Sequence, residues 1–393
     1  MTDDQKILKS KPKVLIFGEV NTHTDDFKRF AKRFEYEFYN LTTKEKFIED
    51  IQTIHNDVEA FWCMYFGFIP IGGLTKDLVE YLPSGLKIIV TSAVGYDPFD
   101  VVALGARGIS VCNSPGLAAN PVADHVLYVT LGLYHYSPVF ENLLRQTKNT
   151  GDCRAILQSG LPWNNEIGRP VLCRVPSDSI TDDQANIPVK PVYGFGDKVG
   201  NRFVRQPRGH VAGIAGLGAI GKEIGARLNS IGMNVCYHNR TRLNPDEEAR
   251  LGYAATYYKS FEDMLPNIDL LILSLPINDS TKHIVNENTL ALLPQGSKIV
   301  NIGRGGLIDT RALIQSLKTG EIHGAALDVF EKEPIVEEEL CDRWDVILTP
   351  HTGSSTQENV LGAEKICIDN LLNFFYKEDK LITIVNKAYL SLK

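Results

Sequence analysis

Short runs of β-branched and other apolar residues alternate with segments of helical period along most of the chain. This alternation predicts an α/β fold with parallel sheets covered by helices on both faces. The strands predicted in the first third are Val14–Phe17, Val58–Trp62, Leu86–Thr91 and Ile109–Cys112, and the helices are Lys44–Ile54, Thr75–Leu82 and Pro98–Ala106.

A long, mostly apolar helix is predicted at Pro121–Tyr136, and the alternation stops after it. Thr147–Gln206 is rich in proline and polar residues and has no sustained period. We therefore expect an irregular insertion there, on the surface or at a subunit interface. A helical tail is expected after His351. The alternation returns with strands near Val211–Ala215, Met233–Tyr237, Leu270–Leu275, Ile299–Ile302 and Ala325–Val329.

The composition narrows the class of protein. The chain is 44% hydrophobic and 23% charged, and its net charge of -7 gives no reason to expect nucleic acid or an anionic membrane as a partner. No apolar run approaches the roughly 20 residues of a membrane span, and the N-terminus lacks a signal-peptide core. The seven cysteines are scattered without a C-x-x-C pair. We expect a cytoplasmic protein with reduced thiols and no metal site.

A G-x-G-x-x-G motif follows the strand that ends near residue 215 and precedes a segment of helical period. Gly216 permits a tight turn, Gly218 lets the backbone approach a pyrophosphate, and Gly221 allows the helix to pack closely on the strand. The first helical amides, at Ala219 and Ile220, would then point at the phosphates. The hexapeptide alone is weak evidence, but a strand before it and a helix after it predict a dinucleotide site.

The residues at the end of the next strand indicate whether NAD(H) or NADP(H) is preferred. An NAD site normally places a carboxylate about 20 residues after the glycines to hold the ribose 2′-hydroxyl. Here the residues are Asn239, Arg240, Thr241 and Arg242, and none of them is acidic. A guanidinium can bind a 2′-phosphate in bidentate fashion. We expect NADP(H) to be favoured through Arg240, with its three neighbours assisting and NAD(H) possible. The alternative is two solvated arginines in a loop.

Three further segments carry groups suited to chemistry. Arg304 lies in a glycine-rich turn after a strand, where a guanidinium can grip a carboxylate with two parallel hydrogen bonds. Glu333 and His351 each follow a strand, and open α/β sheets bind ligands at the carboxyl ends of their strands. A carboxylate beside a histidine fixes the imidazole tautomer and favours its protonated form, which suits proton transfer. Taken singly, the arginine and the histidine would be structural.

Several motifs, in this order and spacing, resemble the D-isomer-specific 2-hydroxyacid dehydrogenase family. They are Gly216–Gly221, Asn301–Gly306, Leu327–Pro334 and Pro350–His351, with Ala93–Asp97 and Asn113–His125 upstream. Tyr237–Thr241 is similar to the NADP-using glyoxylate/hydroxypyruvate reductase branch, including its fungal members. The resemblance implies two Rossmann-like domains with a catalytic cleft between them. Residues 1–125 and 351–393 would form a flavodoxin-like substrate-binding domain, and 126–350 the dinucleotide-binding domain.

The resemblance also implies a role for each motif residue. Arg304 becomes the substrate-binding arginine, His351 the general acid/base, and Glu333 the partner that polarises His351. Val94 and Gly95 would give backbone amides to the carboxylate of a small 2-oxo acid, which would be reduced to the D-2-hydroxy acid in a homodimer. The residues implied at the cofactor are Leu275, Pro276, Ile302 and Asp328.

The chain departs from the family pattern at two places, and two other functions are possible on the same fold. The insertion before the glycine motif is dozens of residues longer than usual, and Asp124 replaces the more usual glutamate before His125. Formate dehydrogenase on the same fold has a glutamine where this chain has Glu333, so the carboxylate argues against it. A dinucleotide-sensing corepressor stays the alternative from another class, although the chain shows no basic nuclear-targeting cluster.

The aromatic-rich stretch Phe61–Phe68 follows a strand of the first unit. It is near where members of the resembled family contact the substrate side chain, and an aromatic wall there would favour apolar or aromatic 2-oxo acids over glyoxylate. The alternative is that these aromatic residues belong to the core.

Overall fold

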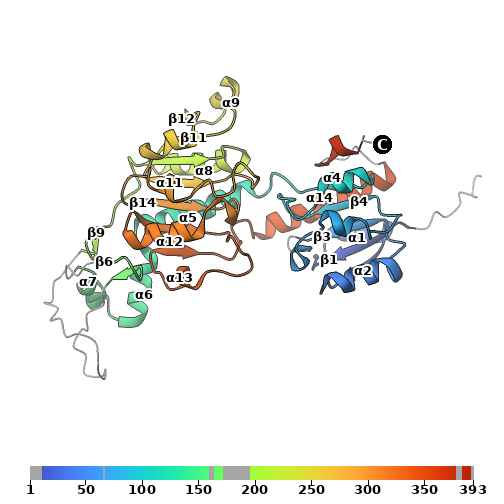
Figure 1. Cartoon of the computed structure of the whole chain (residues 1–393), viewed down its shortest axis with the longest axis horizontal. Helices are drawn as coiled ribbons and strands as arrows, with labels where there is room; N and C mark the ends of the chain where they lie inside the picture. The colour runs from blue at the N-terminus through green and yellow to red at the C-terminus, as the bar shows by residue number, and fades with distance from the viewer. Residues whose placement is uncertain (1–10, 65–66, 159–162, 171–194, 378–382, 391–393) are drawn as a thin grey trace, which may run out of the picture. The chain divides into compact units, whose positions relative to one another are not determined.

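The computed structural model describes residues 11–64, 67–158, 163–170, 195–377 and 383–390, and the chain forms two compact units (Figure 1). Unit 1 comprises residues 1–118 and 355–393, and unit 2 comprises residues 119–354. The boundaries differ from the expected 125/126 and 350/351. The long helix belongs wholly to unit 2, because its buried side chains pack against helix and strands of that unit.

Unit 1 is built on a parallel sheet of five strands in the order β2-β1-β3-β4-β5, the flavodoxin-like doubly wound order. Its elements are β1 (Lys13–Phe17), α1 (Asp25–Arg33), β2 (Glu35–Tyr39), α2 (Lys44–Thr53), β3 (Ala60–Cys63), α3 (Lys76–Val79), β4 (Ile88–Thr91), α4 (Val101–Ala106), β5 (Ser110–Cys112) and α14 (Gln357–Tyr376). Figure 1 shows the red helix α14 beside β4 of this unit, so both ends of the chain contribute to it.

Alternate side chains of these strands enter two separate cores, because successive residues of a strand point to opposite faces of the sheet. Phe17 and Phe61 belong to the core beneath α2, and Ile16 and Trp62 to the core beneath α1 and α14. Phe61 and Trp62 are fully buried and Phe68 is 1% exposed. Of the two interpretations left open for Phe61–Phe68, an aromatic wall or a core, the core is therefore correct for these three residues. Residues 65 and 66 lie outside the described part.

Unit 2 contains a parallel sheet of seven strands in the order β12-β11-β10-β13-β14-β15-β16. The first six follow the 3-2-1-4-5-6 order of a dinucleotide-binding Rossmann fold, so the expected fold class is confirmed. The elements are β10 (Val211–Ala215), α8 (Ala219–Ser230), β11 (Asn234–His238), α9 (Pro245–Ala249), β12 (Ala255–Tyr258), α10 (Phe261–Met264), β13 (Leu270–Leu273), α11 (Glu287–Leu290), β14 (Ser297–Asn301), α12 (Thr310–Thr319), β15 (Ile322–Leu327), α13 (Glu338–Cys341) and β16 (Val346–Leu348).

The sequence prediction missed three strands of the two large parallel sheets: β2, β12 and β16. Each is an edge strand of its sheet. An edge strand is not enclosed on both sides, so it does not need a continuous apolar run. The contrast is clear within unit 2, where every residue of the central strands β13 and β14 is buried, whereas no residue of β12 is fully buried.

The insertion is more ordered than expected where it is described. Three helices precede the Rossmann sheet: α5 (Ala119–Tyr134), α6 (Ser137–Thr147) and α7 (Thr150–Gln158). Two short antiparallel pairs follow: β6 (Trp163–Asn164) with β7 (Arg169–Pro170), and β8 (Lys198–Val199) with β9 (Arg202–Phe203). Apolar residues of α6, α7, β6 and β8 form a separate small core. The irregular segment expected at Thr147–Gln206 was wrong for α7 and for β6–β9, because elements this short carry too few residues to show a period. Helix α5 is the long helix predicted at Pro121–Tyr136, and α6 ends where the expected segment begins.

The buried guanidinium of Arg202 ties this small core to the main sheet. Its Nη1 donates to the carbonyl oxygen of His323 on β15 at 3.0 Å, and its Nη2 donates to Asn165 at 2.7 Å. The guanidinium also lies 4.5 Å from the ring centroid of Trp163.

Candidate active site

The glycine loop joins β10 to α8 and depends on the absence of side chains. Gly216 has a φ of +99°, and a Cβ there would lie 2.5 Å from the carbonyl oxygen of Ser274. A Cβ on Gly221 would lie 2.3 Å from the carbonyl oxygen of Gly216. Gly218 faces open space instead, with nothing within 4 Å of its Cβ position. The first and third glycines therefore let the chain pack tightly, and the second leaves room for a ligand.

This loop fits a dinucleotide pyrophosphate. Ala219 and Ile220 form the first turn of α8, where the helix amides lack partners within the helix and favour an anion. Leu275 lies against the loop, with its Cδ2 3.1 Å from the Cβ position of Gly216. Pro276 follows Leu275, and Ile302 extends the neighbouring strand β14 by donating to Leu273 at 3.2 Å. The residues predicted at the cofactor therefore gather at the carboxyl edge of one sheet.

The two candidate arginines after β11, Arg240 and Arg242, differ in their contacts. Both arginines are exposed, and Arg242 makes two hydrogen bonds to the carboxylate of Glu248, at 2.9 and 3.0 Å. Asn239 accepts a hydrogen bond from the backbone N–H of Leu217 at 2.7 Å, so it supports the glycine loop directly. Thr241 is exposed beside Arg240. Arg240 is thus better placed than Arg242 to meet a 2′-phosphate.

Arg304 lies in a turn whose conformation depends on Asn301 and Gly305. Asn301 at the end of β14 accepts from the N–H of Gly303 at 3.1 Å and donates to the carbonyl oxygen of Arg304 at 2.9 Å. A Cβ on Gly305 would lie 1.9 Å from the carbonyl carbon of Phe330, so only glycine lets these two loops meet. The contact brings Arg304 toward the loop after β15 that carries Glu333.

Glu333 and His351, which the sequence placed only on separate loops, pair in the structure. The Nδ1 atom of His351 lies 3.1 Å from one carboxylate oxygen of Glu333, and the other oxygen accepts from the N–H of Phe330 at 2.9 Å. Burial opposes ionisation of Glu333, but the His351 ring, the Phe330 N–H and the nearby Arg304 charge together hold its pKa below the usual value. Glu333 therefore stays a carboxylate that orients the imidazole, and proton transfer to a substrate would use Nε2.

Asp328, at the end of β15, holds the segment that carries His351. One oxygen of its buried carboxylate accepts from the Thr349 hydroxyl at 2.6 Å and from the Thr352 N–H at 2.9 Å. The other accepts from the Gly353 N–H at 2.9 Å. His351 itself has a φ of +56°, a left-handed conformation uncommon outside glycine. The bonds on both sides of it keep the backbone in that conformation.

The Asp124–His125 pair on α5 also contributes to this arrangement. His125 Nε2 lies 3.2 Å from the hydroxyl oxygen of Thr349, and Asp124 forms an ion pair with Arg227 on α8. The aspartate that departs from the family pattern therefore links two helices of unit 2.

Sequence reasoning missed a second histidine–carboxylate pair. His283 Nε2 lies 2.7 Å from Glu331, whose other oxygen accepts from the N–H of Thr310 at 3.3 Å. The backbone N–H of His283 donates to the carbonyl oxygen of Gly306 at 2.8 Å. The His283–Glu331 pair thus stabilises the turn that follows Arg304. Its position beside this glycine-rich turn is what connects the pair to the site. No motif or spacing in the sequence indicates that the two residues are in contact.

Val94 and Gly95 lie in the loop after β4 of unit 1. Val94 is 38% exposed, and its carbonyl oxygen accepts from the Asn113 side chain at 2.7 Å. Among the described residues, no protein acceptor takes the N–H of either residue.

Two negative findings apply to the described residues alone. They contain no group of three or more His, Cys, Asp or Glu side chains that could hold a metal ion. Within the same ranges, no helix combines the length and apolar character that a membrane span requires.

The Rossmann fold, the open glycine loop and the Glu333–His351 pair define a dinucleotide-dependent oxidoreductase. The family model described as D-isomer specific 2-hydroxyacid dehydrogenase, NAD binding domain, matches residues 196–353. Glyoxylate reductase of Thermococcus litoralis is 33% identical over 317 residues, which cover 80% of this chain and 81% of that protein. 4-Methyl-2-oxopentanoate reductase A of Aspergillus oryzae is 29% identical over 375 residues, with coverage of 95% and 98%.

Among solved structures, the holo form of D-mandelate dehydrogenase from Rhodotorula graminis has a TM-score of 0.80 and 28% identity, covering 96% of this chain and 99% of that one. The chain belongs to the D-isomer-specific 2-hydroxyacid dehydrogenase family. It is an oxidoreductase that acts on the CH–OH group of donors with a nicotinamide dinucleotide, and the family resemblance seen in the sequence is confirmed.

Proposed function

We propose that the protein reduces a small 2-oxo acid to the D-2-hydroxy acid, with NADPH favoured over NADH. The substrate is glyoxylate or hydroxypyruvate, or a larger apolar or aromatic 2-oxo acid. The observation that carries the proposal is the 3.1 Å contact between Glu333 and His351, at the carboxyl edge of the sheet whose glycine loop fits a dinucleotide.

Each catalytic side chain has one task. Arg304 grips the substrate carboxylate in bidentate fashion, and the amides of Val94 and Gly95 bind it as well. His351 donates a proton to the carbonyl oxygen of the substrate as negative charge develops there, and Glu333 orients the imidazole ring for that transfer. The nicotinamide, when bound, supplies the hydride. Asp328 keeps His351 in position through the bonds to Thr349, Thr352 and Gly353 and, by resemblance, lies beside the nicotinamide carboxamide.

The NADPH preference rests on Arg240. Both arginines after β11 are exposed, but Arg242 is engaged by Glu248. No acidic residue stands among Asn239–Arg242 to repel a 2′-phosphate. A guanidinium that binds a phosphate in bidentate geometry favours NADPH.

The division of labour between the units, the quaternary state and the location belong to the same proposal. Unit 1 is the substrate-binding domain and unit 2 the dinucleotide-binding domain. The protein acts as a cytoplasmic homodimer, and its partners are small molecules. Size-exclusion chromatography with light scattering measures the quaternary state, and a monomer at micromolar concentration would contradict it.

The test is the initial rate of NADPH and NADH consumption with glyoxylate, hydroxypyruvate, 2-oxoisocaproate and phenylglyoxylate. We expect turnover with an NADPH preference, and a loss of turnover in His351→Asn with NADPH binding preserved. Normal turnover in His351→Asn would contradict the assignment of the acid. Saturable NADPH binding without reduction of any 2-oxo acid would leave a dinucleotide-sensing, corepressor-like role instead.

A further inference from the structure

The loop after β15 carries two glutamates, and each contacts a histidine from another segment of unit 2. His351 Nδ1 lies 3.1 Å from a carboxylate oxygen of Glu333, and His283 Nε2 lies 2.7 Å from one of Glu331. His283 lies between β13 and α11, beside the turn that carries Arg304. The Glu333–His351 pair accounts for proton transfer, so the Glu331–His283 pair has a different role.

The carboxylate of Glu331 uses both of its oxygens. One contacts His283, and the other accepts the N–H of Thr310, the first residue of α12, at 3.3 Å. Burial opposes ionisation of Glu331, but His283 and Thr310 together hold its pKa below the usual value. Glu331 is therefore a carboxylate at neutral pH, and it joins three segments of the chain: its own loop, the segment of His283 and the start of α12.

The backbone of His283 is fixed against the arginine turn. Its N–H donates to the carbonyl oxygen of Gly306, two residues after Arg304, at 2.8 Å. Its own carbonyl oxygen accepts from the side-chain amide of Asn286 at 2.8 Å. The φ of His283 is +50°, a left-handed conformation that a residue other than glycine keeps only where surrounding contacts hold it. Together with Glu331, these contacts hold the turn in place.

The arginine turn and the glutamate loop also touch directly. A Cβ on Gly305 would lie 1.9 Å from the carbonyl carbon of Phe330 and 2.4 Å from the backbone nitrogen of Glu331. Gly305 follows Arg304, and the N–H of Phe330 donates to Glu333 at 2.9 Å. A movement of either loop would therefore change the distance between the arginine and the carboxylate that orients the acid.

We propose that Glu331 and His283 are positioning residues that set the distance between the arginine for the substrate carboxylate and the histidine that donates the proton. The inference rests on the proposed function, which gives those tasks to Arg304 and His351. One 2-oxo acid must contact both groups at once, and such a constellation has to be held to within about 0.5 Å. Glu331 and His283 act through these two groups and not on the substrate.

The expected losses follow from the number of hydrogen bonds removed. One such bond is worth about fivefold in an equilibrium constant. Replacing His283 with alanine removes one bond to the glutamate, so His283→Ala should lower kcat/KM for a 2-oxo acid by about fivefold. Glu331→Ala removes two bonds and should lower it by about 25-fold. Because the two side chains share one contact, the double variant should also lose about 25-fold, whereas independent effects would multiply to about 125-fold.

His210→Ala is the matched control. His210 Nδ1 lies 3.2 Å from the carboxylate of Asp269, and His210 directly precedes β10 at the amino edge of the sheet in unit 2. The control removes the same kind of pair from the same unit, and we expect an unchanged kcat/KM. The Kd for NADPH, measured by fluorescence titration, should be unchanged in every variant, because the Glu331–His283 pair holds the arginine turn and not the glycine loop. A weakened NADPH affinity in Glu331→Ala would indicate general loss of structure and would overturn the inference.

A binding measurement distinguishes this inference from the proposed reaction. Oxamate is an isostere of pyruvate that carries the carboxylate and is not reduced, and calorimetric titration of the NADPH-saturated protein measures its Kd. We expect this Kd to rise by at least about fivefold in Glu331→Ala and to stay unchanged in His210→Ala. An oxamate Kd that Glu331→Ala leaves unchanged, or a loss of about 125-fold in the double variant, would overturn the inference. Oxamate binding that Glu331→Ala weakens, in a protein that reduces no 2-oxo acid, would overturn the proposed reaction alone. A wild-type protein that neither binds oxamate nor reduces a 2-oxo acid would overturn both.

Discussion

Asp328→Asn changes one atom in a buried carboxylate that orders the segment around His351. The wild-type carboxylate accepts three hydrogen bonds, from the Thr349 hydroxyl and from the N–H groups of Thr352 and Gly353. An asparagine keeps one oxygen and puts an NH2 group in the place of the other. That NH2 then faces a backbone N–H or a hydroxyl donor, and a buried donor loses its partner.

The size of the effect can be estimated from these bonds. Hydrogen bonds to a charged group contribute about 1.5–3 kcal/mol each, and neutral ones about half as much. One bond is lost and two are weakened by about half, so the lower values give a loss of at least about 3 kcal/mol. In a unit of this size, about 3 kcal/mol lowers the Tm by about 6–12 °C. A shift of His351 by about 1 Å would lower kcat/KM by about 100-fold.

The assay combines thermal unfolding with initial rates and NADPH binding by fluorescence. Asp309→Asn is the matched control, because a single carboxylate oxygen of Asp309 accepts from the N–H groups of Arg311 and Ala312 at the start of α12. The asparagine keeps that oxygen. We therefore expect its stability to change by less than about 0.5 kcal/mol and its kinetics to match the wild type.

The outcomes distinguish two roles of Asp328. A lower Tm and a lower kcat with unchanged NADPH affinity indicate a residue that positions the His351 segment. An unchanged Tm with weakened NADPH binding would refute that reasoning and assign Asp328 to the nicotinamide instead.

Three further predictions concern other contacts of the site. In Glu333→Gln kcat should fall by about 10- to 100-fold with NADPH affinity unchanged, because the carboxylate that orients the His351 ring is gone; initial rates and a fluorescence titration measure the two quantities. Arg240→Ala should raise the Kd for NADPH by about 10- to 100-fold and leave NADH unchanged, because a charge-assisted phosphate contact is lost, with Arg242→Ala nearly neutral in a fluorescence titration. His283→Gln should raise the KM for the 2-oxo acid by about fivefold with unchanged NADPH affinity, measured by steady-state kinetics, because one hydrogen bond that holds the arginine turn is lost.

Each of these expectations has a contrary result. A wild-type kcat in Glu333→Gln would show that the carboxylate does not orient the proton donor. Equal losses in Arg240→Ala and Arg242→Ala would mean that Glu248 does not keep Arg242 from the cofactor. A wild-type KM in His283→Gln would show that the His283–Glu331 pair has no effect on substrate binding.

The folded-state pKa of Glu333 also predicts a direction for acid stability. Its value is depressed by His351, the Phe330 N–H and Arg304 against the opposing effect of burial. The stabilisation is therefore present above the pKa of a glutamate in the unfolded chain and is lost as the pH falls through the lower, folded value. Glu333→Gln should accordingly narrow the difference in Tm between pH 6 and acidic pH, and an unchanged difference would contradict the contribution.

The sequence by itself determined the features that depend on local order. Strand–helix alternation specified the α/β class, and the glycine motif at Gly216, Gly218 and Gly221 located the loop that fits a pyrophosphate. These signals are readable because periodicity and glycine conformation act over a few residues. The edge strands were missed because an exposed edge imposes no apolar period, as the exposed Glu35 and Glu37 of β2 illustrate.

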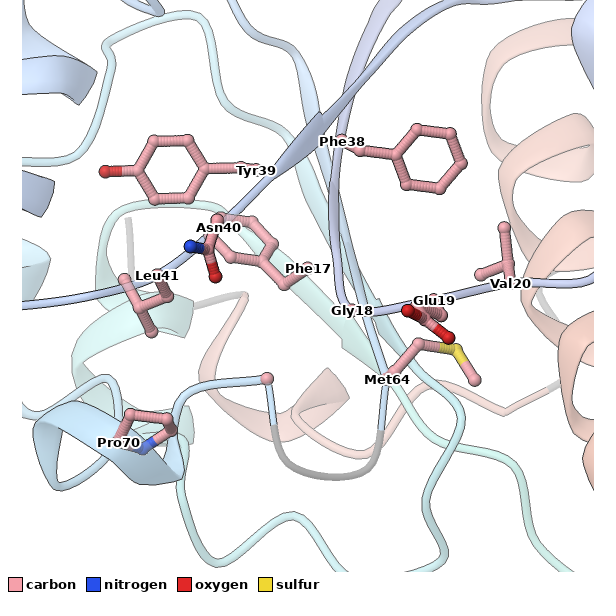
Figure 2. Close-up of a pocket in the computed structure, with 11 residues that line it drawn as sticks. Phe17, Gly18, Glu19, Val20, Phe38, Tyr39, Asn40, Leu41, Met64 and Pro70 are labelled. Carbon is pink, nitrogen blue, oxygen red and sulfur yellow. The ribbon is translucent and has the colours of Figure 1, made fainter.

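Only the tertiary structure decided which side chains meet. The contact of Glu333 with His351 joins residues 18 apart on two loops, and it depends on the approach of Gly305 to Phe330 and on the carboxylate of Asp328. The sequence also did not predict that Trp62 is buried in the core whereas Met64, two residues later, lines a cavity (Figure 2). The physical reason is that packing and hydrogen bonding between distant segments depend on the whole sheet, which no local pattern records.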